Sequence, residues 1–135
     1  MTAMFADAVY WIALINPDDQ WHQKATAARK KRSGAGLVTT EDVLVEVLTY
    51  FGGYGPEARR TAARAVRAIL DDPQVQVIPH TSDTFMKGLE LYEARLDKSY
   101  SMVDCMSMHL MREHDLRDVL THDQHFDQEG FNTLL

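Results

Sequence analysis

The segment SMVDCMSMHLM, residues 101–111, contains one carboxylate, Asp104, among seven apolar or sulfur-containing side chains. At about 100° per residue these side chains surround nearly the whole circumference of a helix, and a helix that is apolar on every side is a buried one. A buried carboxylate without a partner is costly, so such an acid is protonated, paired or bound to a metal ion. The segment therefore predicts a buried helix whose acid requires compensation.

The residues on either side of this segment place the acid at the start of the helix. Ser101 and Asp104 form the pattern Ser-x-x-Asp, which resembles a capping box with Asp in place of the usual Glu. Beyond the helix, DVLTHD at 118–123 is typical of a strand that ends in an acid, and GFNTLL at 130–135 of a short closing strand. Asp104 is thus expected in the first helical turn, shortly before a strand.

The preceding part of the chain alternates between strand and helix patterns. We expect the VQVIP strand to be buried. The helix after LVTT is expected to be capped by Thr39 or Thr40, and the helix of residues 82–96 by its first residue, Ser82. The predicted strands are MFAD (4–7), LVTT (37–40) and VQVIP (75–79), and the predicted helices are AVYWIALIN (8–16), DDQWHQKATAARKKR (18–32), EDVLVEVLTYF (41–51), EARRTAARAVRAILDD (57–72) and SDTFMKGLELYEARL (82–96).

This alternation favours an α/β fold with three layers, α/β/α, around a central and mostly parallel sheet. A length of 135 residues suits a single domain, residues 1–135, with one core. The single cysteine, Cys105, cannot form an internal disulfide, so we expect a reduced thiol and a cytoplasmic protein. The apolar stretch MFADAVYWIALI is too short to span a membrane, so no membrane association is expected.

The charge balance limits the classes of partner. The formal net charge of −6, from twenty acids against fourteen Lys and Arg, argues against broad non-specific affinity for nucleic acid. It does not exclude an enzyme that acts on a phosphodiester, because clustered acids can bind a divalent cation that reverses the local sign of the charge.

Four acids are candidates for a site, and three of them lie where an α/β fold could bring them together. Asp7 and Asp123 follow predicted strands, Asp104 opens the buried helix, and Glu46 lies at the border of the apolar face of its helix. Ligands of such sheets bind beyond the carboxyl ends of the strands, so we expect the first three in one crevice. Clustered carboxylates repel one another, which raises a pKa or attracts a cation, and oxygen ligands suit Mg²⁺ or Mn²⁺.

Each acid also has a purely structural interpretation. Asp104 could serve only as a capping partner, Asp7 and Asp123 could merely end strands, and Glu46 could be a solvated helix residue. The helix face with Arg60, Arg64 and Arg67 is likewise either solvated or a contact for RNA phosphates or for an acidic partner. His122 and His125 are spaced like metal ligands, but with one cysteine and no matching pair elsewhere a zinc site is not expected.

Four segments in this order resemble the PIN-domain nucleases, and most of all the VapC-like toxins of toxin–antitoxin pairs. The segments are FADAVYWIALINPDDQWH, TTEDVLVEVL, DKSYSMVDCMSMHLM and VLTHDQHFDQEGF. The resemblance assigns the catalytic and metal-binding roles to four acids, and the small hydroxyl residue of the last motif to Thr121. These acids are Asp7, Glu46, Asp104 and Asp123. Glu41 and Asp42 are acids of the same helix as Glu46, but they precede the position that aligns.

The resemblance implies an endoribonuclease that depends on Mg²⁺ or Mn²⁺, acting by metal-assisted hydrolysis of RNA phosphodiesters. It further implies a homodimer, and a small antitoxin protein that occupies the acidic groove and places a cationic side chain where the metal binds. The implied role is therefore the toxin of a toxin–antitoxin system.

Two other functions remain open at this stage. The first is a regulatory or binding module with a PIN fold and little catalytic turnover. The second is a phospho-receiver domain that binds Mg²⁺. A receiver needs adjacent acids after its first strand and a late lysine, whereas Asp7 stands alone and no lysine follows Lys98.

Overall fold

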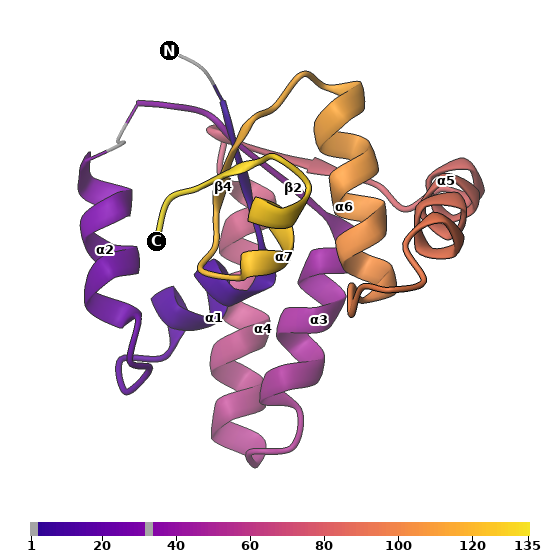
Figure 1. The fold of residues 1–135 in the computed structure, drawn as a ribbon. Helices are drawn as coiled ribbons and strands as arrows, with labels where there is room; N and C mark the ends of the chain where they lie inside the picture. Colours follow the sequence, from indigo (N-terminus) through magenta and orange to yellow (C-terminus); the bar gives the residue numbers. More distant parts are fainter. Residues whose placement is uncertain (1–2, 32–33) are drawn as a thin grey trace.

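The computed structural model describes residues 3–31 and 34–135, which form five strands and seven helices arranged in three layers (Figure 1). The strands are β1 (Met4–Ala6), β2 (Leu37–Thr40), β3 (Val75–Ile78), β4 (Asp118–Leu120) and β5 (Asn132–Thr133). The helices are α1 (Ala8–Ile15), α2 (His22–Lys31), α3 (Glu41–Phe51), α4 (Pro56–Asp71), α5 (Ser82–Ala94), α6 (Met102–Glu113) and α7 (Gln124–Gln128).

The five strands form one sheet in the order β3-β2-β1-β4-β5, and all its paired strands are parallel. The chain first moves outward from β1 to β3, and then returns past β1 to β4 and β5. Because crossovers between parallel strands are right-handed, connections that run in opposite directions along the sheet lie on opposite faces. The connections through α1 to α4 and through α5 to α7 therefore lie on different faces, with α5 packed against α6. In Figure 1, α7 lies in front of the strands and α4 behind them. The predicted α/β/α fold is thereby confirmed.

The reversal of direction between β1 and β4 determines where a ligand can bind. Phe5 of β1 pairs with Val38 of β2 on one side and with Val119 of β4 on the other. The connections after β1 and β4 leave the sheet toward opposite faces, which opens a crevice at the carboxyl ends of these two strands. Asp7 and Asp123 follow these two strands.

The core lies on both faces of β1 and around α6. Phe5 and Ala6 are fully buried, as are Cys105, Met108 and Met111 of α6. The buried helix predicted from residues 101–111 is therefore confirmed. The backbone of α5 lies close to α6 at Gly88, where an added Cβ would come within 2.5 Å of Met106 Cγ.

Three local predictions were wrong at the level of single elements. The VQVIP segment forms β3, an edge strand that pairs with β2 alone within the described residues and is only partly buried. The helix predicted from Asp18 begins at His22, because the Asp19 carboxylate accepts a hydrogen bond from the Trp21 amide in a preceding turn. Its predicted last residue, Arg32, lies outside the described residues.

The third wrong prediction is the cap of α5. Thr81, and not Ser82, accepts the hydrogen bond from the Thr84 amide and forms the N-cap. Of the two candidates for α3, Thr40 is the N-cap and accepts from the Val43 amide. No helix among residues 3–31 and 34–135 is long and apolar enough to cross a lipid bilayer.

Candidate functional site

A pocket of about 590 Å³ opens at the carboxyl ends of β1 and β4, between α1, α3, α6 and α7. The structure brings to it all four acids singled out from the sequence, each from a different segment of the chain. Its lining includes Asp7, Glu46, Asp104 and Asp123, together with His125. Lys and Arg are absent from the described residues that line it.

Asp7 lies at the deepest position, between the end of β1 and the start of α1. Its carboxylate makes no capping bond to α1 and instead accepts a hydrogen bond from the Thr121 hydroxyl, with Oδ2 and Oγ1 3.0 Å apart. Burial, and then the nearby Asp104 carboxylate, raises the pKa of Asp7 to about 7, against the effects of the Ala8 amide and Thr121. Thr121, the small hydroxyl residue of the last motif, therefore connects Asp7 to the VLTHDQHFDQEGF segment.

Asp104 completes a capping box and also lines the pocket, so the capping interpretation does not exclude a place in the site. Its Oδ2 accepts from the Ser101 amide while the Ser101 hydroxyl accepts from the Asp104 amide, each at 3.0 Å, which completes the capping box. The same carboxylate faces the pocket, where Oδ2 lies 3.2 Å from His125 Nδ1. Burial raises the pKa of Asp104 above its ordinary value, and the Ser101 amide opposes this shift.

Asp123 is the N-cap of α7, and its position brings a histidine into the site. Its Oδ1 accepts from the His125 amide at 2.9 Å and lies 3.2 Å from His125 Nδ1. The sequence interpretation did not include His125 in the site. The available signal was its position two residues after Asp123, which a capping turn folds back onto the carboxylate.

Glu46 approaches the pocket from the second turn of α3. It is half-buried, and burial followed by repulsion from Asp104 and Asp123 raises its pKa to about 7. The two other acids of α3 have partners elsewhere. Glu41 accepts from the His80 amide at 2.8 Å, and Asp42, although it borders the pocket, lies 2.9 Å from His80 Nδ1.

These contacts describe a pocket with an excess of negative charge, and its donor set fits a divalent cation. Single ligand atoms of Asp104, Asp123 and His125 all lie within 4.8 Å of one another. Burial is the main cause of the raised pKa values of Asp7 and Glu46, and repulsion from neighbouring carboxylates adds to both shifts. Carboxylate oxygens are the ligands that Mg²⁺ and Mn²⁺ prefer.

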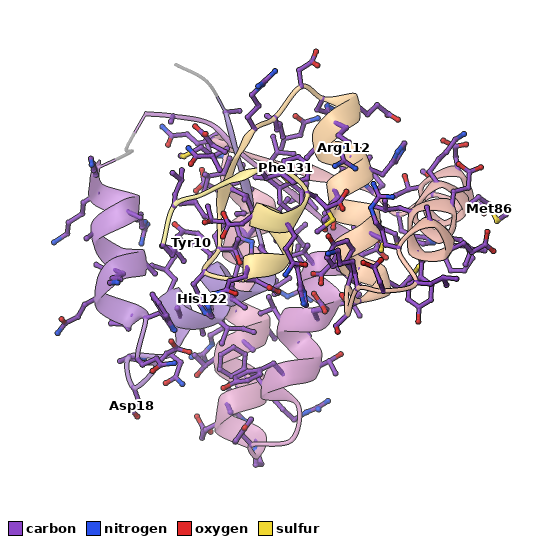
Figure 2. The ribbon with its side chains drawn as sticks, viewed as in Figure 1. Tyr10, Asp18, Met86, Arg112, His122 and Phe131 are labelled. Carbon is purple, nitrogen blue, oxygen red and sulfur yellow. The ribbon has the colours of Figure 1, made fainter. Side chains whose placement is uncertain are left out.

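A separate buried carboxylate holds α7 in place. Glu129, at the end of α7, accepts from Arg95 Nε at 2.8 Å, from Arg112 Nη2 at 2.9 Å and from the Tyr100 hydroxyl at 2.9 Å. Burial alone would raise the pKa of Glu129, but these bonds lower it to about 2. Arg112 also lies over the Phe131 ring, 5.1 Å from its centroid (Figure 2). The Glu129 cluster thus ties α5, α6 and α7 together.

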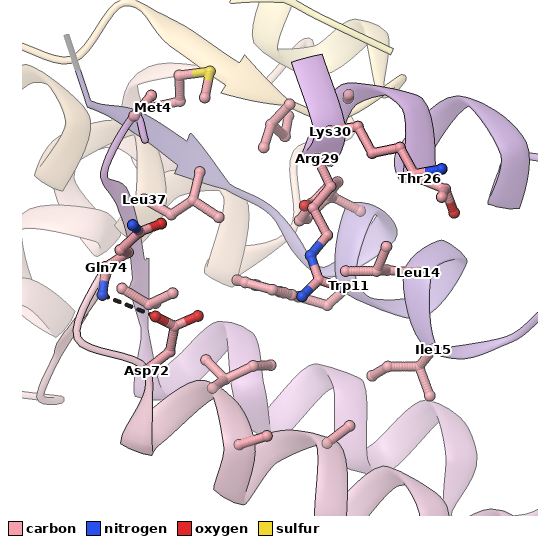
Figure 3. A pocket seen from close by; sticks show the side chains of 18 of the residues that line it. Met4, Trp11, Leu14, Ile15, Thr26, Arg29, Lys30, Leu37, Asp72 and Gln74 are labelled. Carbon is pink, nitrogen blue, oxygen red and sulfur yellow. Dashed lines mark hydrogen bonds between the residues drawn. The ribbon is translucent and has the colours of Figure 1, made fainter. Parts of the chain in front are cut away.

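The larger cavity of the molecule lies elsewhere and has a different character. It has a volume of about 690 Å³ and lies between α1, α2, α4 and the sheet. Figure 3 shows Trp11, Leu14 and Ile15 in its wall, and the Asp72 carboxylate at its border, bonded to the Gln74 amide. Its mostly apolar lining offers no convergence of acids, so the smaller acidic pocket is the candidate site.

The family of the chain follows from a comparison with protein families. The profile of the PIN domain matches residues 4–132. The chain belongs to the PIN domain family. The resemblance read from the four sequence segments is confirmed, and membership of the PIN domain family replaces the phospho-receiver interpretation.

Solved structures with a similar fold agree with this assignment. The VapC20 toxin of Mycobacterium tuberculosis, described as cleaving the sarcin–ricin loop, is 26% identical, with a TM-score of 0.86 and 95% of each chain covered. VapBC2 from Rickettsia felis, bound to a promoter DNA fragment, is 10% identical with a TM-score of 0.68, covering 98% of this chain and 97% of the other. FitAcB from Neisseria gonorrhoeae is 10% identical with a TM-score of 0.71, covering 100% and 97%. The last two similarities concern the fold alone.

A comparison with curated protein sequences gave no significant match. The PIN domain assignment of this chain therefore rests on the family profile and on the structural similarity.

Proposed function

We propose that this PIN domain is a metal-dependent endoribonuclease and the toxin of a toxin–antitoxin pair. The observation that carries the proposal is the convergence of Asp7, Glu46, Asp104 and Asp123 in one pocket where the described lining has no Lys or Arg. The similarity to VapC20, a toxin that cleaves the sarcin–ricin loop, supports RNA as the substrate and a cytoplasmic site of action. The whole chain, residues 1–135, acts in this proposal as a single nuclease domain.

In this proposal, Asp7, Asp104 and Asp123 hold Mg²⁺ or Mn²⁺, with Glu46 completing the set. The bound cation supplies Lewis acidity and makes a nucleophilic water available near neutral pH. Thr121 orients Asp7 through the hydrogen bond to its Oδ2, and the Ser101 amide orients Asp104. Glu46, at the partly exposed border of the pocket, is placed to orient the attacking water or to accept its proton.

The direct test is cleavage of a single-stranded RNA by the full chain with Mg²⁺ or Mn²⁺, with and without EDTA. We expect cleavage by the wild type to stop in EDTA and to be lost in Asp104→Asn. Full cleavage by the mutant, or by the wild type in EDTA, contradicts the proposal. If calorimetry detects no binding of either cation at millimolar concentration, a PIN-fold binding module with little turnover takes its place.

The proposed partners follow from the same pocket. Solved relatives include the VapBC2 and FitAcB complexes, which supports a small antitoxin as the protein partner. An Arg or Lys of the antitoxin that enters the acidic pocket would neutralise the carboxylates in place of the cation. We also propose a homodimer, which gel filtration with light scattering tests through its mass. Growth arrest on expression, relieved by a small protein encoded beside this chain, tests the toxin role.

A further inference from the structure

We propose that His125 donates an imidazole nitrogen to the cation site, so that the site selects Mn²⁺ or a similar transition-metal ion over Mg²⁺. This inference rests on the proposed function in one respect, namely that a divalent cation binds between Asp104 and Asp123. It adds a ligand outside the set of four acids, and it assigns a metal preference that the acids alone would leave open.

The first support is the position of the imidazole. His125 Nδ1 lies 3.2 Å from Asp104 Oδ2 and 3.2 Å from Asp123 Oδ1. Two ligand atoms on adjacent corners of an octahedron, each about 2.1 Å from the ion, are roughly 3 Å apart. The nitrogen therefore already has the spacing of a neighbouring ligand to both carboxylates, without rearrangement of the backbone.

The second support is that contacts of the His125 backbone and of its ring restrain the imidazole in this position. The His125 amide donates to Asp123 Oδ1 at 2.9 Å, so the backbone that carries the imidazole is attached to one of the carboxylates. The Tyr100 ring meets the imidazole edge-on, with centroids 5.3 Å apart. The Tyr100 hydroxyl is itself bonded to Glu129 at the end of α7. His125 is thus restrained at its backbone by Asp123 and at its ring by Tyr100, which Glu129 in turn holds.

The chemistry of an imidazole ligand explains the proposed preference for Mn²⁺ over Mg²⁺. Mg²⁺ is a hard cation that retains several waters and binds oxygen ligands, whereas imidazole nitrogen suits transition metals. A site of carboxylates alone distinguishes Mg²⁺ from Mn²⁺ weakly. An added nitrogen favours Mn²⁺, and we expect replacing His125 to lower the Mn²⁺ affinity by about tenfold or more while Mg²⁺ affinity changes less.

The competing interpretation is that His125 only lies within hydrogen-bonding distance of the two acids, as in this structure, and binds no cation. Pulsed electron paramagnetic resonance on the full chain with bound Mn²⁺ separates the two, because it detects the ¹⁴N nuclear coupling of a coordinated imidazole. We expect ¹⁴N modulation in the wild type and its loss in His125→Ala. The protein has six histidines, so His122→Ala is the matched control. His122 stacks on Trp21, with centroids 4.2 Å apart, and should leave the signal unchanged.

Calorimetric titration of Mn²⁺ and Mg²⁺ into the wild type, His125→Ala and His122→Ala measures the ratio of the affinities for the two cations. The proposal is overturned if the wild type binds Mn²⁺ without ¹⁴N modulation, or if His125→Ala keeps the wild-type ratio of affinities. Asp104→Asn distinguishes this failure from failure of the proposed function. If Mn²⁺ binding depends on Asp104 but not on His125, only the role of His125 is wrong; if no divalent cation binds, the metal-dependent nuclease is wrong as well.

Discussion

Glu129 and the pocket around Asp7 are two places where this protein buries carboxylates, and their surroundings are opposite. The Glu129 side chain is 5% exposed and is bonded by Arg95, Arg112 and Tyr100, so its pKa falls to about 2. Asp7 is buried among other acids, and its pKa rises to about 7. Arginine side chains compensate Glu129, whereas the described residues that line the pocket around Asp7 include no Lys or Arg.

This difference separates a structural acid from a candidate functional one. A buried acid that only holds elements together is stabilised by paired positive charge, because an unpaired buried charge destabilises the fold. Buried acids that repel one another around an open pocket persist where an external cation compensates them, and such perturbed groups concentrate at functional sites. The two places therefore predict opposite responses to substitution, pH and metal ions.

The largest expected effect is on catalysis by the acidic pocket. Asp7→Asn should lower the rate of RNA cleavage by about a hundredfold or more, because the change removes charge from the proposed cation site. Asp42→Asn is the matched control. Asp42 borders the same pocket but is paired with His80, and we expect its replacement to leave cleavage near the wild-type rate. Equal losses in the two variants would break the distinction between an acid buried among other acids and an acid bonded to a histidine outside that group.

The next effect is on stability and belongs to Glu129. Glu129→Ala should lower the free energy of unfolding by about 2 kcal/mol, since it removes charge-assisted hydrogen bonds that tie α5, α6 and α7 together. Glu90→Ala serves as the control, because the Glu90–Lys87 pair is exposed and contributes at most about 0.5 kcal/mol. Urea denaturation of both variants measures the difference, and similar small losses would mean that Glu129 is not a structural acid.

The free energy of unfolding of the metal-free protein should fall as pH rises, whereas an acid paired with a cation, such as Glu129, makes it rise. The pKa values of Asp7 and Glu46 rise to about 7 from 3.8 and 4.5, so between about pH 4.5 and 7 the folded state holds protons that the unfolded chain has released. The free energy of unfolding should therefore fall as pH rises through this range, by at most about 1.4 kcal/mol per pH unit for each proton.

Urea denaturation at a series of pH values, on protein freed of divalent ions, measures this slope. Addition of Mn²⁺ at pH 7 should restore the lost stability, because a bound cation compensates the ionised carboxylates. Stability that rises steadily from pH 4.5 to 7 without metal would show that the acids of the pocket are already compensated within the chain.

The smallest expected effect is on the stability of the metal-free protein when one acid of the pocket is neutralised. Without metal, Asp104→Asn should raise the free energy of unfolding by about 1 kcal/mol, because it removes a charge that repels Asp7 and Glu46. The amide oxygen of Asn can still accept from the Ser101 amide and preserve the capping box. Asp83, an acid in the first turn of α5, offers the control, and Asp83→Asn should not stabilise the protein. Thermal denaturation of both variants without metal tests the pair.

Local patterns in the sequence were sufficient for most of the elements. The capping box of Ser101 and Asp104 joins residues three apart, so it could be recognised without tertiary information. Single element ends were less predictable. Thr81 and Ser82 are adjacent and chemically similar caps, and only the backbone path selects Thr81. The burial of β3 depends on its place at the sheet edge, which its own residues do not encode.

The candidate site was predictable only where acids coincide with element ends. Asp7 and Asp123 could be placed by parallel-sheet geometry, whereas Glu46, in mid-helix, was selected through the family resemblance. His125 was missed although it lies two residues after Asp123, because its contact with Asp104 joins residues 21 apart in the chain. The role of Glu129 was equally hidden, since Arg95 lies 34 residues before it.

The sequence by itself determined the alternation of strands and helices, the buried helix around Asp104 and the acids at the strand ends, because periodicity and capping act over a few residues. Only the tertiary structure decided which acids share a pocket, which acid receives arginine partners, and that a histidine joins Asp104 and Asp123. These pairings depend on the order of strands in the sheet and on the reversal between β1 and β4, which bring together segments distant in sequence.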